Sequence, residues 1–297
     1  PRSSRRSIEI LMPSKYRFLI IDGYAKASRN EFDVVGMKHA WRLYAEMLTK
    51  YLPGAEYAVW LPSDNPIPPD GLGPEHYHGI LWTGCNLTIY HLDNPCVTRQ
   101  IDYAKQSYEA GTPGFGTCWG LQMAAVAAGG EVRANPRGRE MGIARKVRLT
   151  DEGSRHPMLE GKPPVYTGFI SHLDEVTQLP AGATLLATND FTHVQAIEVK
   201  HRKGTFWATQ YHPEYDLHEV ARLIVAREPR LLREGFFATH EDLAGYVEKL
   251  EALAQDPARK DLRWQLDIDD DVLSDSVRQI EFRSWIDKLV LPLAAGR

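Results

Sequence analysis

The chain has 297 residues, 43% of them hydrophobic and 25% charged, with a formal net charge of −4. This composition argues against a disordered chain, and it lacks the basic surplus that is typical of nucleic-acid-binding proteins. The apolar runs fall short of the roughly 18–20 residues that a membrane-spanning helix needs, so neither nucleic acid nor a membrane is an expected partner.

Residues 1–15 are basic and contain only a short apolar run. Because that run is far shorter than the core of a signal peptide, we predict a loose N-terminal tail. The three cysteines, Cys85, Cys96 and Cys118, do not form a disulfide framework. A reducing, cytoplasmic location is therefore predicted.

From residue 16 onward, strand-like and helix-like segments alternate. Short apolar runs predict buried strands at 16–24, 57–61, 78–84 and 113–118. Apolar residues at helical spacing predict helices at 37–52, 98–110 and 119–128. This alternation favours an α/β fold, with a mainly parallel sheet that carries helices on both faces. In such sheets, functional sites form at the carboxyl ends of the strands.

Cys118 lies at one of these strand ends, in the stretch "PGFGTCWGLQ". Gly116 and Gly120 flank it at two residues on either side, which gives the G-x-C-x-G form of a nucleophile elbow. The helix that begins after Cys118 favours negative charge at its N-terminus and so helps to lower the pKa of the thiol. A buried structural cysteine beside a glycine-rich turn is the alternative reading of this motif.

A thiolate nucleophile needs a base, and the base needs an orienting group. The stretch "GTFWATQYHPEYD" supplies a strand followed by His212, Pro213 and Glu214. Glu214 can reach the far nitrogen of the His212 imidazole, and Pro213 restricts the backbone between them. An ordinary surface loop is the other explanation of a lone His-x-Glu, but finding both motifs in one α/β chain argues against coincidence.

Together, "GTCWGLQ" and "QYHPE" resemble the signatures of the class I, triad-type glutamine amidotransferases. The stretch "FISHLDEVTQLPAGATLLATND" at 169–190 is similar to a segment of the GMP-synthase-like branch of that family. The resemblance covers roughly residues 16–225 and implies a flavodoxin-like α/β fold. It implies L-glutamine as substrate and no cofactor or metal.

The resemblance also implies a role for each matching residue. Cys118 would attack the glutamine amide, His212 would act as acid and base, and Glu214 would orient His212. Backbone N–H groups of Trp119 and Gly84 would stabilise the oxyanion, although Gly84 is followed by Cys85 where the family usually has Gly or Pro. The glutamyl end of the substrate would contact three residues, Gln122, Ser171 and Leu173. His172 and Asp174 match the family motif, with a structural role as the alternative.

Three other features favour ordinary structural roles. His76 and His78 stand two apart as a metal pair could, but no cluster of carboxylates or cysteines supports them. Cys85 is expected to behave as a small hydrophobic residue. The acidic stretch "DIDDDVL" at 267–273 lacks the glycine and terminal glutamate of a calcium loop, so it predicts a solvated turn or helix start.

Residues 226–297 form a predicted helical extension. Amphipathic patterns run through Leu243 to Leu253 and through Val277 to Leu289. About 70 residues cannot hold a nucleotide-binding domain, and neither a phosphate-binding loop nor a pyrophosphatase loop is found in the chain. The chain therefore looks like the glutaminase half of an amidotransferase without its acceptor half.

Three functions remain open from the sequence. The first is a GMP-synthase-like glutamine amidotransferase that supplies ammonia to a separate synthetase subunit, and this is the main prediction. The second is a stand-alone γ-glutamyl hydrolase or peptidase. The third is a non-catalytic redox or binding protein, against which the intact Gln122 and His-Pro-Glu motif argue. The sequence leaves the oligomeric state open, including a homo-oligomer.

Overall fold

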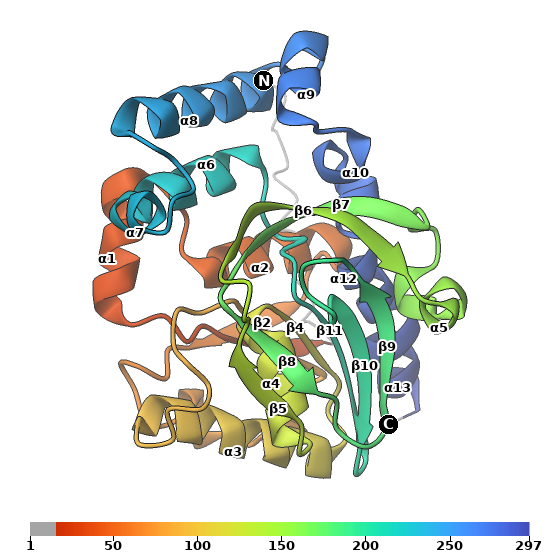
Figure 1. The fold of residues 1–297 in the computed structure, drawn as a ribbon. Helices are drawn as coiled ribbons and strands as arrows, with labels where there is room; N and C mark the ends of the chain where they lie inside the picture. Colours follow the sequence, from red (N-terminus) through yellow and green to blue (C-terminus); the bar gives the residue numbers. More distant parts are fainter. Residues whose placement is uncertain (1–15, 297) are drawn as a thin grey trace, which may run out of the picture.

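The structure, a computed structural model, describes residues 16–296, so the predicted tail at 1–15 lies outside the described residues. A nine-stranded sheet crosses the protein in the order β2-β1-β3-β4-β11-β10-β9-β6-β7 (Figure 1). The first five strands run parallel: β2 (Glu56–Trp60), β1 (Arg17–Ile21), β3 (Gly79–Trp82), β4 (Gly114–Thr117) and β11 (Gly204–Thr209). The other four pair antiparallel: β10 (Ala196–His201), β9 (Ala183–Thr188), β6 (Glu140–Leu149) and β7 (Val165–His172). A two-stranded ribbon is formed by β5 (Glu131–Ala134) and β8 (Asp174–Gln178).

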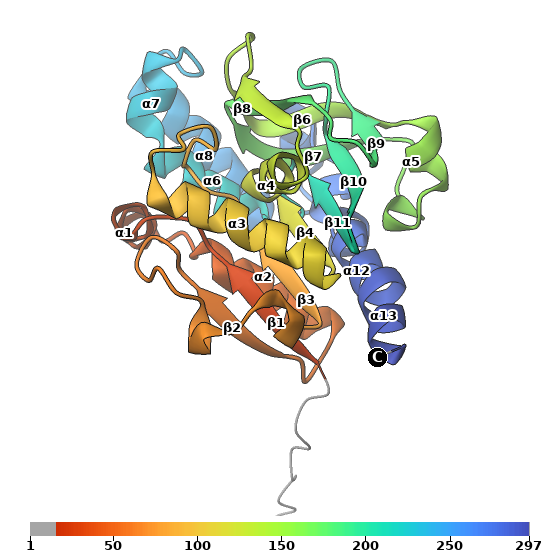
Figure 2. The ribbon, with the colours of Figure 1, turned by 90° about the horizontal axis from the view of Figure 1, so that it is seen from below.

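Helices cover both faces of the parallel half of the sheet (Figure 2). One face carries α3 (Pro95–Ala110) and α4 (Trp119–Ala127), and the other carries α2 (Ala40–Tyr51) and α12 (Ile280–Trp285). The side chains of β1 alternate accordingly, because successive residues of a strand point to opposite faces. Leu19 and Ile21 pack on the α3 and α4 side, whereas Phe18 and Ile20 pack on the other. The predicted α/β fold is confirmed. The strands of its antiparallel half, β6, β7, β9 and β10, were not among those predicted from short apolar runs.

The remaining helices are short or lie at the periphery. They are α1 (Lys26–Val35), α5 (Asp151–Arg155), α6 (Leu217–Ala226), α7 (Glu228–Arg233), α8 (His240–Gln255), α9 (Lys260–Leu266), α10 (Asp270–Leu273), α11 (Asp275–Arg278) and α13 (Leu291–Ala295). Among residues 16–296, no helix combines the length and the apolar character that a membrane crossing needs.

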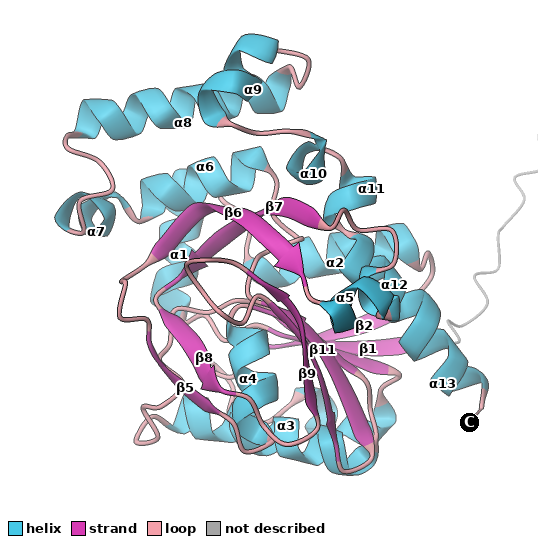
Figure 3. Ribbon diagram, turned by 45° about the vertical axis from the view of Figure 1, so that its right-hand side comes forward, coloured by secondary structure: helices cyan, strands magenta, loops and turns pink. Residues whose placement is uncertain are grey.

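The C-terminal segment contains helices α7 to α13 and packs into the same core as the sheet. Helix α8 lies along α6 on the outside of the molecule (Figure 3), where Leu243 and Leu250 join a cluster with Val220. At the other end, Trp285 packs against Phe18 at a ring-centroid distance of 6.0 Å. The segment is therefore built onto the α/β body, and a domain boundary at residue 226 stays a prediction.

The second predicted helix of this segment is broken. In place of one helix through Val277 to Leu289, the structure has α11, then α12, then one turn of π-helix at Ile286–Val290. The buried ammonium group of Lys162 donates hydrogen bonds to the carbonyl oxygens of Val277 and Arg278, at 3.0 and 3.3 Å. These two carbonyl groups thus bind a side chain from another part of the chain at the junction of α11 and α12. The amphipathic pattern of the sequence does not reveal this contact.

Candidate active site

Cys118 sits on the turn between β4 and α4, with φ 51° and ψ −99°. A positive φ is uncommon for a residue with a side chain and costs free energy, so the surrounding contacts must hold it. One such contact is the hydrogen bond from the Cys118 backbone N–H to the carbonyl oxygen of Thr209, at 2.8 Å. The side chain is largely buried, and its sulfur lies 3.6 Å from the carbonyl oxygen of Ser171.

The two glycines that flank Cys118 are required by close backbone packing. A Cβ atom on Gly116 would lie 2.7 Å from the Cα atom of Gly120, and a Cβ atom on Gly120 would lie 2.7 Å from the carbonyl oxygen of Trp82. Both distances are too short for any side chain, and the opposing atoms belong to the backbone. The predicted nucleophile elbow is therefore confirmed, with strand β3 as the wall against which it turns.

His212 and Glu214 lie at the same edge of the sheet as Cys118. Strands β4 and β11 are parallel neighbours that pair Thr117 with Thr209, so the residues that follow each strand emerge side by side. The Nδ1 atom of His212 is 2.7 Å from Oε1 of Glu214, and both side chains are buried. The structure thus brings these three predicted residues, called the Cys118 cluster below, to one place.

The charges of the Cys118 cluster favour a protonated imidazole. Burial lowers the pKa of His212, but the Glu214 carboxylate and the Cys118 sulfur outweigh that effect and raise the pKa to about 10. Because Nδ1 faces Glu214, Nε2 is the nitrogen left for chemistry, and it makes no hydrogen bond with a described residue. At neutral pH this arrangement can hold an imidazolium beside the Cys118 sulfur.

Three further side chains support the cluster and were missed in the sequence. The Thr117 hydroxyl donates to Oε1 of Glu214 at 2.9 Å, and the Tyr44 hydroxyl lies 2.8 Å from the Thr117 oxygen. The Tyr215 ring stacks on the His212 imidazole, with centroids 4.2 Å apart and planes 9° apart. Thr117 precedes Cys118 and Tyr215 follows Glu214 in the sequence, so their positions could have indicated a role at the site. Tyr44 is brought in from α2 by the fold alone.

The two residues expected to supply oxyanion donors flank Cys118. Trp119 is the first residue of α4, where a backbone N–H has no partner within the helix. Gly84 approaches from the loop after β3: a Cβ atom on it would lie 2.8 Å from Cε1 of His212 and 3.8 Å from Cβ of Cys118. The loop can come this close to the cluster only because residue 84 is glycine.

The residues expected to bind the glutamyl end of a substrate line a pocket that opens beside Cys118. Gln122, Ser171 and Leu173 all contribute to its wall. The Gln122 amide nitrogen donates to the carbonyl oxygen of Asp174 at 3.0 Å, which ties α4 to the start of β8. These side chains come together around the sulfur, as the sequence predicts, and their roles toward a substrate stay predictions.

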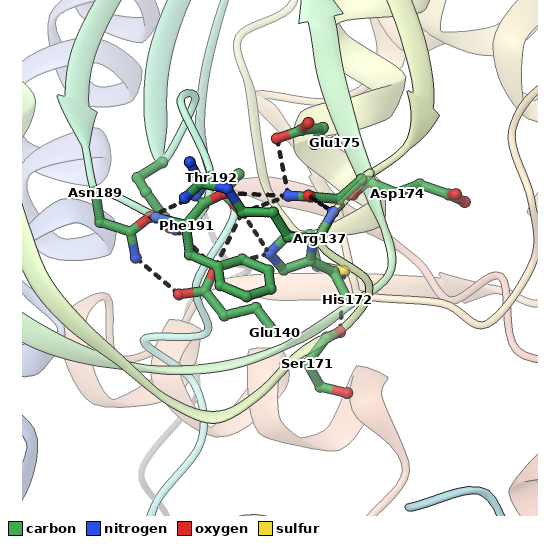
Figure 4. Close-up of polar contacts among 12 residues, drawn as sticks. Arg137, Glu140, Ser171, His172, Asp174, Glu175, Asn189, Phe191 and Thr192 are labelled. Atoms are coloured by element: carbon green, nitrogen blue, oxygen red, sulfur yellow. Dashed lines mark hydrogen bonds and ion pairs between the residues drawn. The ribbon is translucent and has the colours of Figure 1, made fainter. Parts of the chain in front are cut away.

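His172 is held by a buried polar cluster around Glu140 (Figure 4). Its Nε2 atom lies 3.1 Å from Oε2 of Glu140, and its Nδ1 atom lies 2.9 Å from the carbonyl oxygen of Asp174. The other oxygen of Glu140 accepts from the Asn189 side chain at 2.7 Å. With both ring nitrogens occupied, His172 fits the structural alternative. Asp174 has a side-chain contact of its own, because it accepts from the Tyr90 hydroxyl at 3.0 Å.

The lesser sequence features lie outside the Cys118 cluster. Cys85 lines the pocket, but burial raises the pKa of its thiol well above the usual value, so it is protonated at neutral pH. Asp269 caps the short helix α10, as expected for a helix start in the acidic stretch. No group of three or more histidine, cysteine or acidic side chains within residues 16–296 is arranged to hold a metal ion, and this includes His76 and His78.

One wall of the pocket comes from a part of the chain that no motif indicated. Leu223 of α6 and Leu231 of α7 line it, together with Arg227 and Arg230. Tyr24, which follows β1, belongs to the same pocket, and its ring packs edge-on against Phe32 of α1 at a centroid distance of 4.9 Å. The start of the C-terminal helical segment thus helps to enclose the space above Cys118.

Comparisons with known proteins agree with this architecture. The family described as "Glutamine amidotransferase class-I" matches residues 75–228. A γ-glutamyl-L-1-hydroxyisopropylamide hydrolase of a Pseudomonas species is 37% identical over 94% of this chain and 95% of its own length. The glutamine-hydrolysing GMP synthase of Symbiobacterium thermophilum is 34% identical, but over only 46% of this chain and 24% of its own. Among solved structures, a glutamine amidotransferase of Thermotoga maritima aligns with a TM-score of 0.65 at 16% identity, covering 93% of this chain and 98% of its own.

Proposed function

Because the chain belongs to the class I glutamine amidotransferase family, we propose that it hydrolyses γ-glutamyl amides of small amines, without a synthetase partner, through a thioester on Cys118. One observation carries the proposal: the pocket beside Cys118 is enclosed by Leu223, Arg227, Arg230 and Leu231 of the chain's own C-terminal part. A wall of this kind gives the chain its own means of binding the amine half of a substrate.

The full-length similarity to the Pseudomonas hydrolase supports this choice over the main sequence prediction. That relative is matched through the C-terminal helices as well as the α/β body, whereas the GMP synthase match stops at about half of this chain. A glutaminase subunit that passes ammonia to a synthetase is the second candidate, and the partial GMP synthase similarity is the observation in its favour.

The proposed reaction begins with a thiolate on Cys118. The thiolate attacks the γ-carbonyl carbon, and the carbonyl electron pair moves onto the oxygen, which the backbone N–H groups of Gly84 and Trp119 stabilise. His212 gives its Nε2 proton to the leaving amine as the C–N bond breaks, which leaves a γ-glutamyl thioester.

The second half of the reaction regenerates the enzyme. His212, now neutral, takes a proton from water as the water oxygen attacks the thioester carbon, and the sulfur leaves as thiolate. The products are glutamate and the free amine. Glu214 keeps its charge throughout and holds the imidazole in one orientation, as the carboxylate of a catalytic triad does.

The test is to trap the intermediate on the purified chain. Rapid mixing with γ-glutamyl methylamide, followed by acid quenching, is expected to add the mass of one γ-glutamyl group to the peptide that contains Cys118. Methylamine and glutamate should appear in equal amounts. The Cys118→Ala variant should give neither the adduct nor the products, and an adduct on any other residue contradicts the proposed mechanism.

A further inference from the structure

Three arginines gather at the pocket that contains Cys118. Arg139 lies just before β6, Arg227 lies between α6 and α7, and Arg230 lies on α7. All three line the pocket. The pocket also includes apolar side chains, such as Leu231. Arg139 and Arg227 are half-buried, whereas Arg230 is exposed at the pocket.

Two of the three arginines are paired with carboxylates, and the third is not. Arg139 pairs with Glu234 at 2.8 Å, and Arg227 pairs with Glu31 at 3.1 Å. Within residues 16–296, the Arg230 side chain forms no salt bridge and no hydrogen bond. Partial desolvation lowers the pKa of Arg230, the positive charges of Arg139 and Arg227 lower it further, and the Glu234 carboxylate raises it. Since a guanidinium group stays protonated in proteins, Arg230 keeps its charge at any physiological pH.

The arginines and the expected glutamyl-binding residues come from different elements. Gln122 lies on α4, and Ser171 and Leu173 lie at the end of β7 and just beyond it. In the proposed function, the γ-glutamyl group occupies that wall while its carbonyl carbon meets Cys118. The amine half of the substrate then extends toward the remaining wall, which Arg227 and Arg230 help to form.

We propose that Arg230, supported by Arg139 and Arg227, binds a carboxylate on the amine half of the substrate, so that the enzyme prefers γ-glutamyl amino acids to γ-glutamyl amides of uncharged amines. This inference rests on the proposed function. A guanidinium group matches the two oxygens of a carboxylate geometrically, and such hydrogen bonds are among the strong ones. The preference differs from the uncharged hydroxyisopropylamide in the name of the Pseudomonas relative.

A matched pair of substrates isolates the carboxylate. γ-Glutamylglycine and γ-glutamylglycinamide have nearly the same shape and differ by the charge at the far end. We expect kcat/KM to be about tenfold higher for the acid, which is the size expected from one charge-assisted hydrogen bond. Raising the ionic strength should raise KM for the acid and leave KM for the amide unchanged, since salt screens the attraction.

Variants at two positions of α7 then assign the effect. Arg230→Met should raise KM for γ-glutamylglycine about tenfold and leave γ-glutamylglycinamide unaffected. Arg230→Lys should recover part of the loss, because it restores the charge without the planar fork. Arg233→Met is the control, since Arg233 lies on the same helix but outside the pocket. It should behave as the unmodified protein with both substrates.

The outcomes distinguish failure of the proposed carboxylate subsite from failure of the proposed hydrolytic function. If Arg230→Met weakens both substrates equally, Arg230 contacts the glutamyl half, and the inference is wrong. It is equally wrong if the variant changes neither substrate, or if the unmodified protein prefers the amide. These results leave γ-glutamyl amide hydrolysis standing. If the unmodified protein hydrolyses glutamine but neither of these two substrates nor γ-glutamyl methylamide, the proposed function itself fails.

Discussion

The guanidinium group of Arg278 donates a hydrogen bond to the carbonyl oxygen of Pro213, 3.3 Å away, in the turn between His212 and Glu214. Arg278 is buried and also contacts Asp275 of its own helix. Through this bond, a side chain of the C-terminal helices holds the peptide that sets the distance between the imidazole and its carboxylate.

A second contact joins the same helices to the residue before His212. Glu281 forms a buried ion pair with Lys162 at 2.7 Å and also contacts the hydroxyl group of Tyr211. The Tyr211 hydroxyl lies 2.8 Å from that of Tyr166 on β7. The backbone on both sides of His212 is thus tied to the helices that follow it in sequence.

Arg278→Met is expected to lower kcat about tenfold with little change in KM, because it loosens the turn that positions His212 without touching the substrate pocket. Steady-state kinetics with γ-glutamyl methylamide measure this split. The control is Arg283→Met on the neighbouring helix α12, where the side chain is exposed. A loss confined to KM, or an equal loss in the control, contradicts a positioning role for Arg278.

Alkylation should distinguish Cys118 from the other pocket cysteine. A glutamine-like diazo-ketone is expected to modify Cys118 once and to leave Cys85 untouched, because burial keeps the Cys85 thiol protonated. Peptide mapping after labelling gives the site. Cys118→Ala should abolish both labelling and hydrolysis, whereas Cys85→Ala should retain both. Activity that survives in Cys118→Ala would rule out the thioester mechanism.

The pH dependence of kcat/KM should report the charge of Glu214. Protonated His212 is the acid of the first half-reaction, and kcat/KM reports the groups of the free enzyme, so kcat/KM should fall as the pH rises through the His212 pKa of about 10. Glu214→Gln removes the negative charge that raises this pKa. The alkaline limb should therefore move to lower pH, by about 1–3 units.

The exposed pair of His218 and Glu251 supplies the control for this shift. Glu251→Gln should leave the pH profile of kcat/KM unchanged. An alkaline limb that stays in place in Glu214→Gln would mean that Glu214 does not set the pKa of His212.

Thr117→Val tests the support behind the carboxylate. The change keeps the shape of the side chain but removes the hydroxyl that donates to Glu214 at 2.9 Å. Since a hydrogen bond to a charged group contributes roughly 1.5–3 kcal/mol, kcat should fall about tenfold or more. Thr112→Val is the matched control, because the Thr112 hydroxyl is also buried but donates to Pro74, on an element that holds none of the Cys118 cluster. Equal activity of the two variants would exclude Thr117 from the site.

The sequence predicted most of the features that depend on residues close together along the chain. The elbow at Cys118 and the pair of His212 and Glu214 are short-range motifs, and the parallel strands before them place the two motifs at one sheet edge. The residues that the sequence did not reveal reach the site through tertiary packing. Tyr44 arrives from α2, and Arg278 arrives from 65 residues beyond Pro213. No local pattern records such contacts.

Function was harder to predict than the site for the same reason. The motifs around Cys118 fit both a glutaminase subunit and a stand-alone hydrolase. The sequence prediction therefore followed the segment at 169–190, which resembles the GMP-synthase-like branch. The distinguishing feature is the pocket wall at Leu223 to Leu231, which has an ordinary amphipathic sequence. Its position above Cys118 becomes visible only when the chain is folded.

Turnover of the purified chain alone tests the central claim most directly. A self-sufficient hydrolase should cleave γ-glutamyl amides at a kcat near the typical enzyme value of about 10 s⁻¹, and adding a cell extract should not change that rate. A subunit that awaits a synthetase should instead be slow with every substrate, and its partner should raise the rate on glutamine by about 10²–10³, as an oxyanion donor at Gly84 is brought into line. The first result is the one predicted here, and the second would contradict it.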